Sequence, residues 1–254
     1  MMIDNLPSMR RKINILGVIP ARGGSKGIPH KNIVRLRGKP LIAYAVAAAK
    51  QSSLLDACVV STDDPRIAQV ARSYGADVPF LRPKRLAGDR ASDIGFLRHA
   101  LAWVGKHRGW HPDILVILQP TSPFRTGRDI DAVITKMKRH RCDSIRTVIH
   151  PSPYNPFKMW RFTNEQEIAM RPLLPTARYR RLGTDVPRQM LPRYVLQVGL
   201  VYATRAAFVR KGMVWGPKMC GFEMPQERFV DIDTSADLAR AHTAGYRRGS
   251  GRCA

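Results

Sequence analysis

The stretch INILGVIPARGGSK, residues 13–26, combines an apolar run with a basic, glycine-containing segment, and this combination points to the fold. Its first half, Ile13 to Ile19, is apolar and rich in β-branched residues, so we expect a buried strand. Its second half is a basic loop with two glycines, which let a backbone fold closely around a ligand and turn N–H groups inward. In doubly wound sheets ligands bind at the carboxyl ends of strands, so the loop is predicted to be functional.

Strand and helix patterns alternate along the rest of the chain. Further strands are expected at residues 57–60, 78–81, 114–118, 144–149, 195–202, 222–224 and 229–232. Helices are expected at residues 40–50, 65–74, 92–105, 126–140 and 235–246. This alternation predicts an α/β fold with a mostly parallel, doubly wound (Rossmann-like) sheet.

One domain, residues 13–246, accounts for this pattern. Residues 151–194 interrupt it, because they are dense in Pro, Arg and Tyr and show neither period clearly. We expect a small insertion there that covers a site or pairs with another subunit. Residues 1–12 and 247–254 are basic and are expected to be flexible tails.

The charge of the chain is strongly positive. Lys and Arg total 43 against 19 Asp and Glu, for a formal net charge of +24. Such a balance favours anionic partners. A nucleic-acid-binding protein would interleave basic and aromatic residues on one surface, whereas the motifs here fall on loops at strand ends. Nucleic acid is therefore not expected as the main partner, and a nucleotide site leaves most of the excess charge unexplained.

The sequence argues against a membrane segment and against cysteine-based scaffolds. No apolar run approaches the roughly 20 residues of a membrane span. The first strand resembles a signal peptide core, but it is short, contains an asparagine and lacks a small-residue cleavage site. The cysteines are far apart and form no C-x-x-C pair, so neither a disulfide framework nor a zinc ribbon is expected. They are Cys58, Cys142, Cys220 and Cys253. We expect a cytoplasmic protein.

Residues 20–32, the loop after the first strand, carry three cations: Arg22, Lys26 and Lys31. These cations suit a triphosphate, whose charge must be neutralised as pyrophosphate leaves. The loop fits neither the G-x-x-x-x-G-K-[ST] nor the G-x-G-x-x-G spacing. The alternative is a flexible basic loop that binds no ligand. The position of the loop at the end of a strand favours a ligand-binding role instead.

Three further motifs carry polar groups. In the turn at 119–123, two prolines present Gln119, whose amide suits sugar hydroxyls. On a strand, Asp231 and Asp233 would point to one face with Cα atoms roughly 6.6 Å apart and could share Mg²⁺, or Asp233 could cap the last helix. In the insertion, Arg188 could grip a carboxylate and Lys158 could add a point charge, unless both are ordinary surface charges.

Together these motifs resemble the acylneuraminate cytidylyltransferase family, the CMP-sialic acid synthetases, over about residues 13–239. The resemblance implies a homodimer that uses CTP and Mg²⁺. Its implied partner is a nonulosonic acid, an acidic 2-keto-3-deoxy sugar such as sialic, legionaminic or pseudaminic acid, and pyrophosphate is released. The sister activity on 3-deoxy-octulosonic acid is the alternative. The matching segments are 19–32, 61–63, 81–83, 119–123, 187–189 and 231–234.

The resemblance also implies roles for residues. Arg22, Lys31 and Arg188 would be catalytic, and Asp231 and Asp233 would hold the metal. The nucleotide-binding residues would be Ala21, Arg22, Gly23, Gly24, Ser25, Lys26, Asn32, Arg82 and Ser92. The sugar-binding residues would be Gln119, Lys158 and Arg188. Many relatives carry Asn-Gly where this chain has Val198-Gly199, which puts the identity of the sugar in question.

Overall fold

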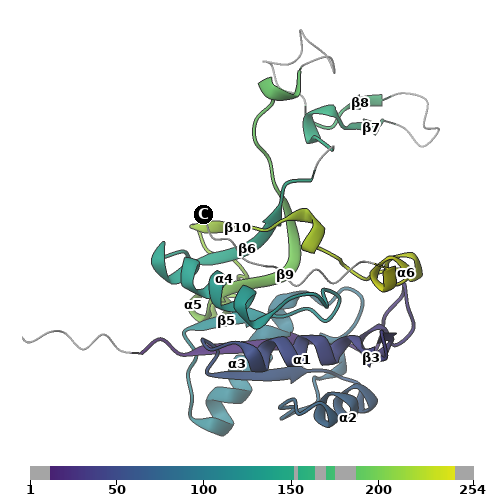
Figure 1. Ribbon diagram of the computed structural model, residues 1–254. Coiled ribbons are helices and arrows are strands. Elements are labelled where there is room, and N and C mark those ends of the chain that lie inside the picture. The colour runs from purple at the N-terminus through teal and green to yellow at the C-terminus, as the bar shows by residue number, and fades with distance from the viewer. Residues whose placement is uncertain (1–11, 152–153, 164–169, 175–186, 244–254) are drawn as a thin grey trace, which may run out of the picture.

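The structure is a computed structural model that describes residues 12–151, 154–163, 170–174 and 187–243. A six-stranded sheet lies at its centre, in the order β10-β6-β9-β5-β1-β4 (Figure 1). Strand β9 is antiparallel to β5 and β6, and the other pairs are parallel. The strands are β1 Ile15–Pro20, β4 Ala57–Ser61, β5 Ile114–Ile117, β6 Ser144–Ile149, β9 Leu196–Arg205 and β10 Met219–Glu223. The predicted α/β fold with a mostly parallel sheet is confirmed.

Helices cover both faces of the sheet. Side chains that alternate along each strand pack on α1, α2 and α4 on one face and on α3 and α5 on the other, as expected for strands buried on both faces. The helices are α1 Leu41–Gln51, α2 Pro65–Ser73, α3 Asp93–Arg108, α4 Gly127–Arg139, α5 Ala206–Arg210 and α6 Ser235–Thr243. Short strands pair as β2 Arg35–Leu36 with β3 Lys39–Pro40, and as β7 Trp160–Phe162 with β8 Met170–Pro172. Among the described residues, no helix is long and apolar enough to span a bilayer.

Helix α4 shows how local sequence sets an element. Thr126 accepts a hydrogen bond from the backbone N–H of Asp129, and Asp129 accepts one from the backbone N–H of Thr126. This reciprocal pair is a capping box, and it satisfies two N–H groups that a helix start leaves free. The predicted start at Thr126 is therefore confirmed.

Two predicted strands are wrong. Residues 78–81 make only an isolated bridge at Leu81, because Pro79 removes a donor from any ladder there. Residues 229–232 pair with no strand in the described part of the chain. A single backbone bond, from Ile232 N to Thr121 O at 2.9 Å, ties them to the turn after β5. Apolar side chains there pack on α6 and β2 instead of joining the sheet.

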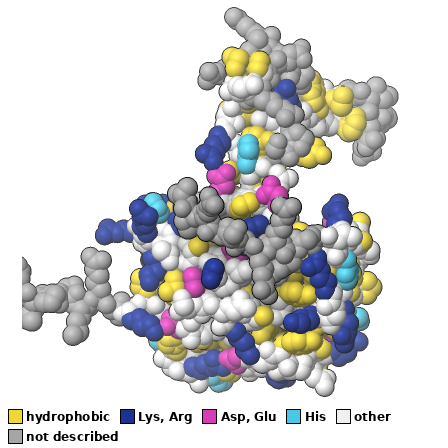
Figure 2. All heavy atoms as spheres, viewed as in Figure 1, with side chains coloured by type: hydrophobic (Ala, Val, Ile, Leu, Met, Phe, Trp, Pro, Cys, Tyr) yellow, Lys and Arg dark blue, Asp and Glu magenta, His cyan; other side chains and the backbone are white. Residues whose placement is uncertain are grey.

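The insertion leaves the sheet between β6 and β9 and carries β7 and β8 away from it (Figure 1). Its described part exposes large apolar side chains, and apolar atoms are visible on this arm in Figure 2. They are Tyr154, Met159, Trp160, Phe162, Met170, Leu173, Leu174 and Met190. On the body, Lys and Arg side chains are scattered over the visible face (Figure 2). Except for Lys12, the predicted tails lie outside the described residues.

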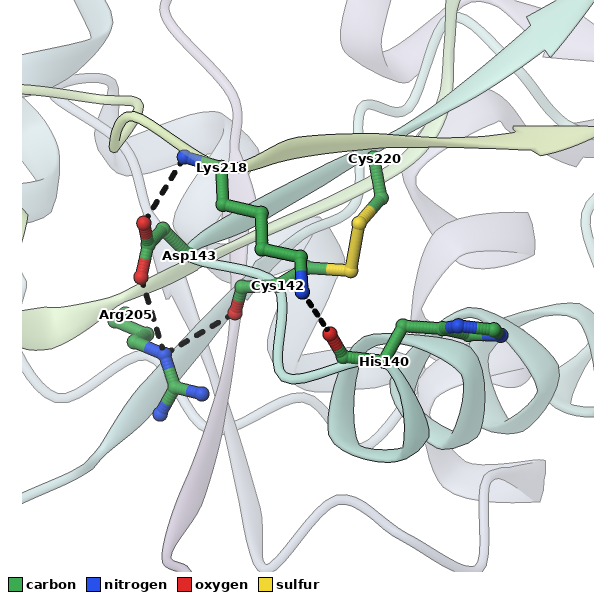
Figure 3. Close-up of a disulfide and its surroundings, with 6 residues drawn as sticks. All are labelled: His140, Cys142, Asp143, Arg205, Lys218 and Cys220. Carbon is green, nitrogen blue, oxygen red and sulfur yellow. Dashed lines mark hydrogen bonds and ion pairs between the residues drawn. A yellow bond between two sulfur atoms is a disulfide. The ribbon is translucent and has the colours of Figure 1, made fainter.

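One disulfide joins Cys142 to Cys220, where the sequence predicted none (Figure 3). Strands β6 and β10 run in parallel with Met219 opposite Ser144, which brings together two cysteines that are 78 residues apart. Beside the bridge, Lys218 donates its backbone N–H to Asp143 and its side chain to the carbonyl oxygen of His140 (Figure 3). Spacing in the sequence could not reveal this neighbourhood. Within the described part of the chain, Cys58 is the free cysteine.

Candidate active site

A cleft of about 530 Å³ opens at the carboxyl ends of β1 and β5. Four segments that are far apart in sequence line it: the loop after β1, residues 82–96, the turn after β5, and residues 231–233. The predicted site residues that meet there are Arg22, Ser25, Lys26, Lys31, Asn32, Arg82, Ser92, Gln119, Asp231 and Asp233. The doubly wound topology accounts for this location, because ligands in such sheets bind in the crevice at the carboxyl ends of the strands.

Other predicted residues do not line the cleft. Ala21 is fully buried beneath the loop. Gly23 and Gly24 face a second, open hollow on the other side of the loop. Lys158 belongs to the short helix η3 (Pro156–Lys158) and Arg188 to η4 (Arg188–Met190), both in the insertion. Their roles therefore stay predictions, and the side chain of Arg188 lies outside the described part.

The end of β4 and Asn32 hold the loop after β1. The backbone N–H of Ala21 donates to Ser61 O, and that of Gly23 donates to Asp63 Oδ1, each at 3.0 Å. Asn32 is buried and donates from Nδ2 to Arg22 O at 2.9 Å. Its amide therefore fixes the loop from within, a role that the sequence did not predict.

The loop cations pair with carboxylates across the cleft. Asp89 forms ion pairs with Arg22 Nη1 at 3.3 Å and with Lys26 Nζ at 2.9 Å. Lys31 Nζ lies 2.6 Å from Asp233 Oδ1. The hydrogen bond from Lys26 is the main reason that the pKa of Asp89 is lowered. These carboxylates occupy positions that phosphate oxygens could take, and no motif pointed to Asp89.

Arg82 is held rigidly in the wall of the cleft. It donates from Nε to Ser61 Oγ at 3.1 Å and from Nη2 to Ser61 O, and its guanidinium lies 5.0 Å from the centre of the Phe96 ring. Burial lowers its pKa to about 10, so it stays charged at neutral pH. A buried cation facing the cleft favours an anionic ligand there.

Asp231 and Asp233 differ in their surroundings. Burial is the main reason that the pKa of Asp231 is raised, and the charge of Asp233 raises it further. Thr121 opposes this with a hydrogen bond, while the buried Oδ1 of Asp231 has no partner in the described residues. Asp233 is exposed and pairs with Lys31. Two carboxylates with room for phosphates and water match what Mg²⁺ prefers, so the donor set fits this ion.

Comparison with known proteins identifies the family. A family model described as "Cytidylyltransferase" matches residues 16–159, more than half of the chain. The chain belongs to the cytidylyltransferase family. It is similar to N-acylneuraminate cytidylyltransferase of Escherichia coli O18:K1:H7, with 44% identity over 244 residues that cover 94% of this chain and 54% of that protein. It therefore spans about half the length of this relative.

Two further likenesses extend the comparison. Pseudaminic acid cytidylyltransferase of Campylobacter jejuni (serotype O:23/36) is 29% identical over 223 residues, which cover 88% of this chain and 92% of that one. Among solved structures, CMP:2-keto-3-deoxy-manno-octonic acid synthetase complexed with CTP is 20% identical, with a TM-score of 0.66 over 91% of this chain and 97% of that chain. At that identity the structural likeness supports the fold alone.

Proposed function

We propose that the chain transfers a cytidylyl group from CTP to a nonulosonic acid and releases pyrophosphate. The observation that carries this proposal is the cleft, where the cations of the loop after β1 face Asp231 and Asp233. The relatives support it, because two of them are named for activities on nonulosonic acids. The octulosonic acid alternative draws on the fold likeness alone.

In the proposed reaction a hydroxyl oxygen of the sugar acid attacks the α-phosphorus of CTP. The bond from that phosphorus to the bridging oxygen breaks, and pyrophosphate takes the electron pair. Such transfers depend on in-line positioning and charge neutralisation. Arg22, Lys26 and Lys31 supply the neutralising charges. The incoming phosphates take the place of Asp89 as the partner of Arg22 and Lys26.

Asp231 and Asp233 would hold Mg²⁺, which when bound adds Lewis acidity and positive charge next to the phosphates. Asp231 is suited to this because its buried oxygen gains a partner when a cation arrives. Lys31 pairs with Asp233, so it links the loop to the carboxylates. Gln119 lies in the same cleft and would hydrogen-bond the sugar.

We also propose a homodimer in which the insertion meets a second copy. Its exposed apolar side chains support this, because monomers rarely expose so many on one arm. Lys158 and Arg188 would then reach the sugar acid in the neighbouring cleft. A cytoplasmic location is part of the same proposal, because CTP is a cytoplasmic metabolite.

Two variants test the proposed roles by steady-state kinetics of pyrophosphate release. Asp233→Asn should lower turnover by about a hundredfold or more while the unfolding temperature stays close to that of the wild type. Arg188→Ala should raise the KM for the sugar acid and leave the KM for CTP unchanged. Full turnover by Asp233→Asn would remove the metal role, and a raised KM for CTP in Arg188→Ala would contradict the placement of the insertion.

A further inference from the structure

Arg125 lies behind Gln119 and is itself outside the cleft lining. Its side chain is buried, with 4% of the residue exposed. It donates from Nη2 to the carbonyl oxygen of Gln119 at 2.7 Å, and from Nη1 to the carbonyl oxygen of Leu200 in β9. One guanidinium therefore ties the turn after β5 to the neighbouring strand. Burial lowers the pKa of Arg125 to about 10, so the guanidinium is charged at neutral pH.

An irregularity in β9 presents the carbonyl of Leu200. Against β6, Tyr202 pairs with Arg146 and Val198 pairs with Thr147, so residues 199–201 have no partner in the ladder. The Thr147 hydroxyl hydrogen-bonds the backbone of this segment instead. It accepts from the backbone N–H of Val201 at 3.2 Å and lies 3.0 Å from the carbonyl oxygen of Val198. A bulge of this kind bends a strand and redirects its groups.

The bulge also brings Gly199 against the amide of Gln119. A Cβ atom at residue 199 would lie 2.2 Å from Gln119 Oε1, closer than any real contact. The side chain of Gln119 also hydrogen-bonds the hydroxyl of Tyr202, which donates to Asp93 in the cleft lining. The side chain of Gln119 is thus packed against Gly199 and hydrogen-bonded to Tyr202, and Arg125 holds its backbone carbonyl.

We propose that Arg125 is a positioning residue for the sugar acid: it locks the turn after β5 to the bulge of β9, so that the amide of Gln119 keeps one orientation over Gly199. The inference rests on the proposed function for the identity of the ligand, but the locked amide is a property of the chain alone. An amide in one orientation offers its free donor and acceptor at fixed points, which favours one arrangement of hydroxyls over others.

Arg125→Lys and Gly199→Ala test this from two sides. Each should raise the KM for the acid by about tenfold and leave the KM for CTP unchanged, the loss expected for one misplaced hydrogen bond. The acid is whichever of N-acetylneuraminate, legionaminate and pseudaminate the wild type uses best. Gly199→Ala displaces only the far end of a flexible side chain, so it stays informative if Arg125→Lys unfolds. An unchanged KM for the acid in folded Gly199→Ala would overturn the proposal.

Arg205→Gln is the matched control. Arg205 lies at the far end of the same strand and donates to the carbonyl oxygen of Cys142 at 3.1 Å, away from the cleft. It should leave both KM values unchanged. In a Gln119→Ala background, Arg125→Lys should no longer affect the KM for the acid, whereas an additive effect would show that Arg125 does not act through Gln119.

A measurement without substrate separates this inference from the proposed function. In ¹⁵N-labelled protein, the side-chain amide of Gln119, assigned with Gln119→Ala, should give a dispersed signal that shifts to the position of a free glutamine in Arg125→Lys. A signal that stays dispersed in that variant would overturn the inference. If no acid supports turnover by the wild type, the proposed function fails and this spectrum still decides the role of Arg125.

Discussion

Gly27 gives the sharpest prediction, because its hydrogen occupies the space where the loop after β1 meets residues 231–233. A Cβ atom at residue 27 would lie 2.1 Å from the carbonyl oxygen of Asp233. Since C···O contacts of about 3.3 Å are the closest that are common, Gly27→Ala must separate the two segments by about 1 Å. That movement shifts Lys31 and Asp233 relative to each other. A displacement of about 1 Å in an active site costs about a hundredfold in rate.

The assay is pyrophosphate release from CTP, Mg²⁺ and the preferred acid, together with thermal unfolding. Gly27→Ala should lose about a hundredfold in kcat and little in unfolding temperature, because both segments lie at the surface. Gly105→Ala is the matched control: its Cβ would lie 3.3 Å from the His111 ring, outside the cleft, and should leave kcat unchanged. A folded Gly27→Ala variant with kcat within a factor of about three of the wild type would show that turnover does not depend on this close contact.

Three further predictions follow from the site and the disulfide. Burial raises the pKa of Asp231 above 3.8, so its carboxyl group holds a proton more tightly in the folded chain than in the unfolded chain. The free energy of unfolding therefore falls as the pH rises from the pKa of the unfolded chain to that of the folded chain. Asp231→Asn should therefore raise the unfolding temperature at pH 7 and abolish turnover. The rise should become smaller as the pH approaches 4. An unchanged unfolding temperature at pH 7 would contradict this prediction. Asp89→Asn should lower the KM for CTP at low salt. The effect should be smaller in 0.5 M salt, where the Debye length falls to about 4 Å and charges are screened. An equal or higher KM in the variant would count against the role of Asp89. Reducing the bridge between Cys142 and Cys220 should lower the free energy of unfolding by about 4 kcal/mol, as measured by urea denaturation with and without reductant, and equal curves would show that the bridge adds nothing.

The sequence predicted the parts of the fold that depend on local pattern. The unbroken apolar run at 114–118 indicated a strand buried on both faces, and it is the centre of the sheet. The run at 229–232 looked equally strand-like but lies outside the sheet, because an extended segment that packs on a helix buries the same kinds of side chain. Apolar pattern records burial and cannot record whether a neighbouring strand is present.

The candidate site was predicted as far as its segments carry recognisable motifs. Asp89 was missed because its partners, Arg22 and Lys26, lie more than sixty residues away in the chain. The contact of Gln119 with Gly199 depends on a bulge, which no residue in β9 signals on its own. The disulfide was missed for the same reason, since the pairing of β6 with β10 creates it. Long-range pairing is the information that a single sequence lacks.

Activation of a nonulosonic acid with CTP in this cleft is tested by pyrophosphate release from CTP and Mg²⁺ with a panel of nonulosonic and octulosonic acids. The CMP-sugar product is identified by mass spectrometry. We predict release with at least one nonulosonic acid and none without an acid. Release with 3-deoxy-octulosonic acid alone, or no release by folded protein that binds CTP, would show that the chain does not activate nonulosonic acids.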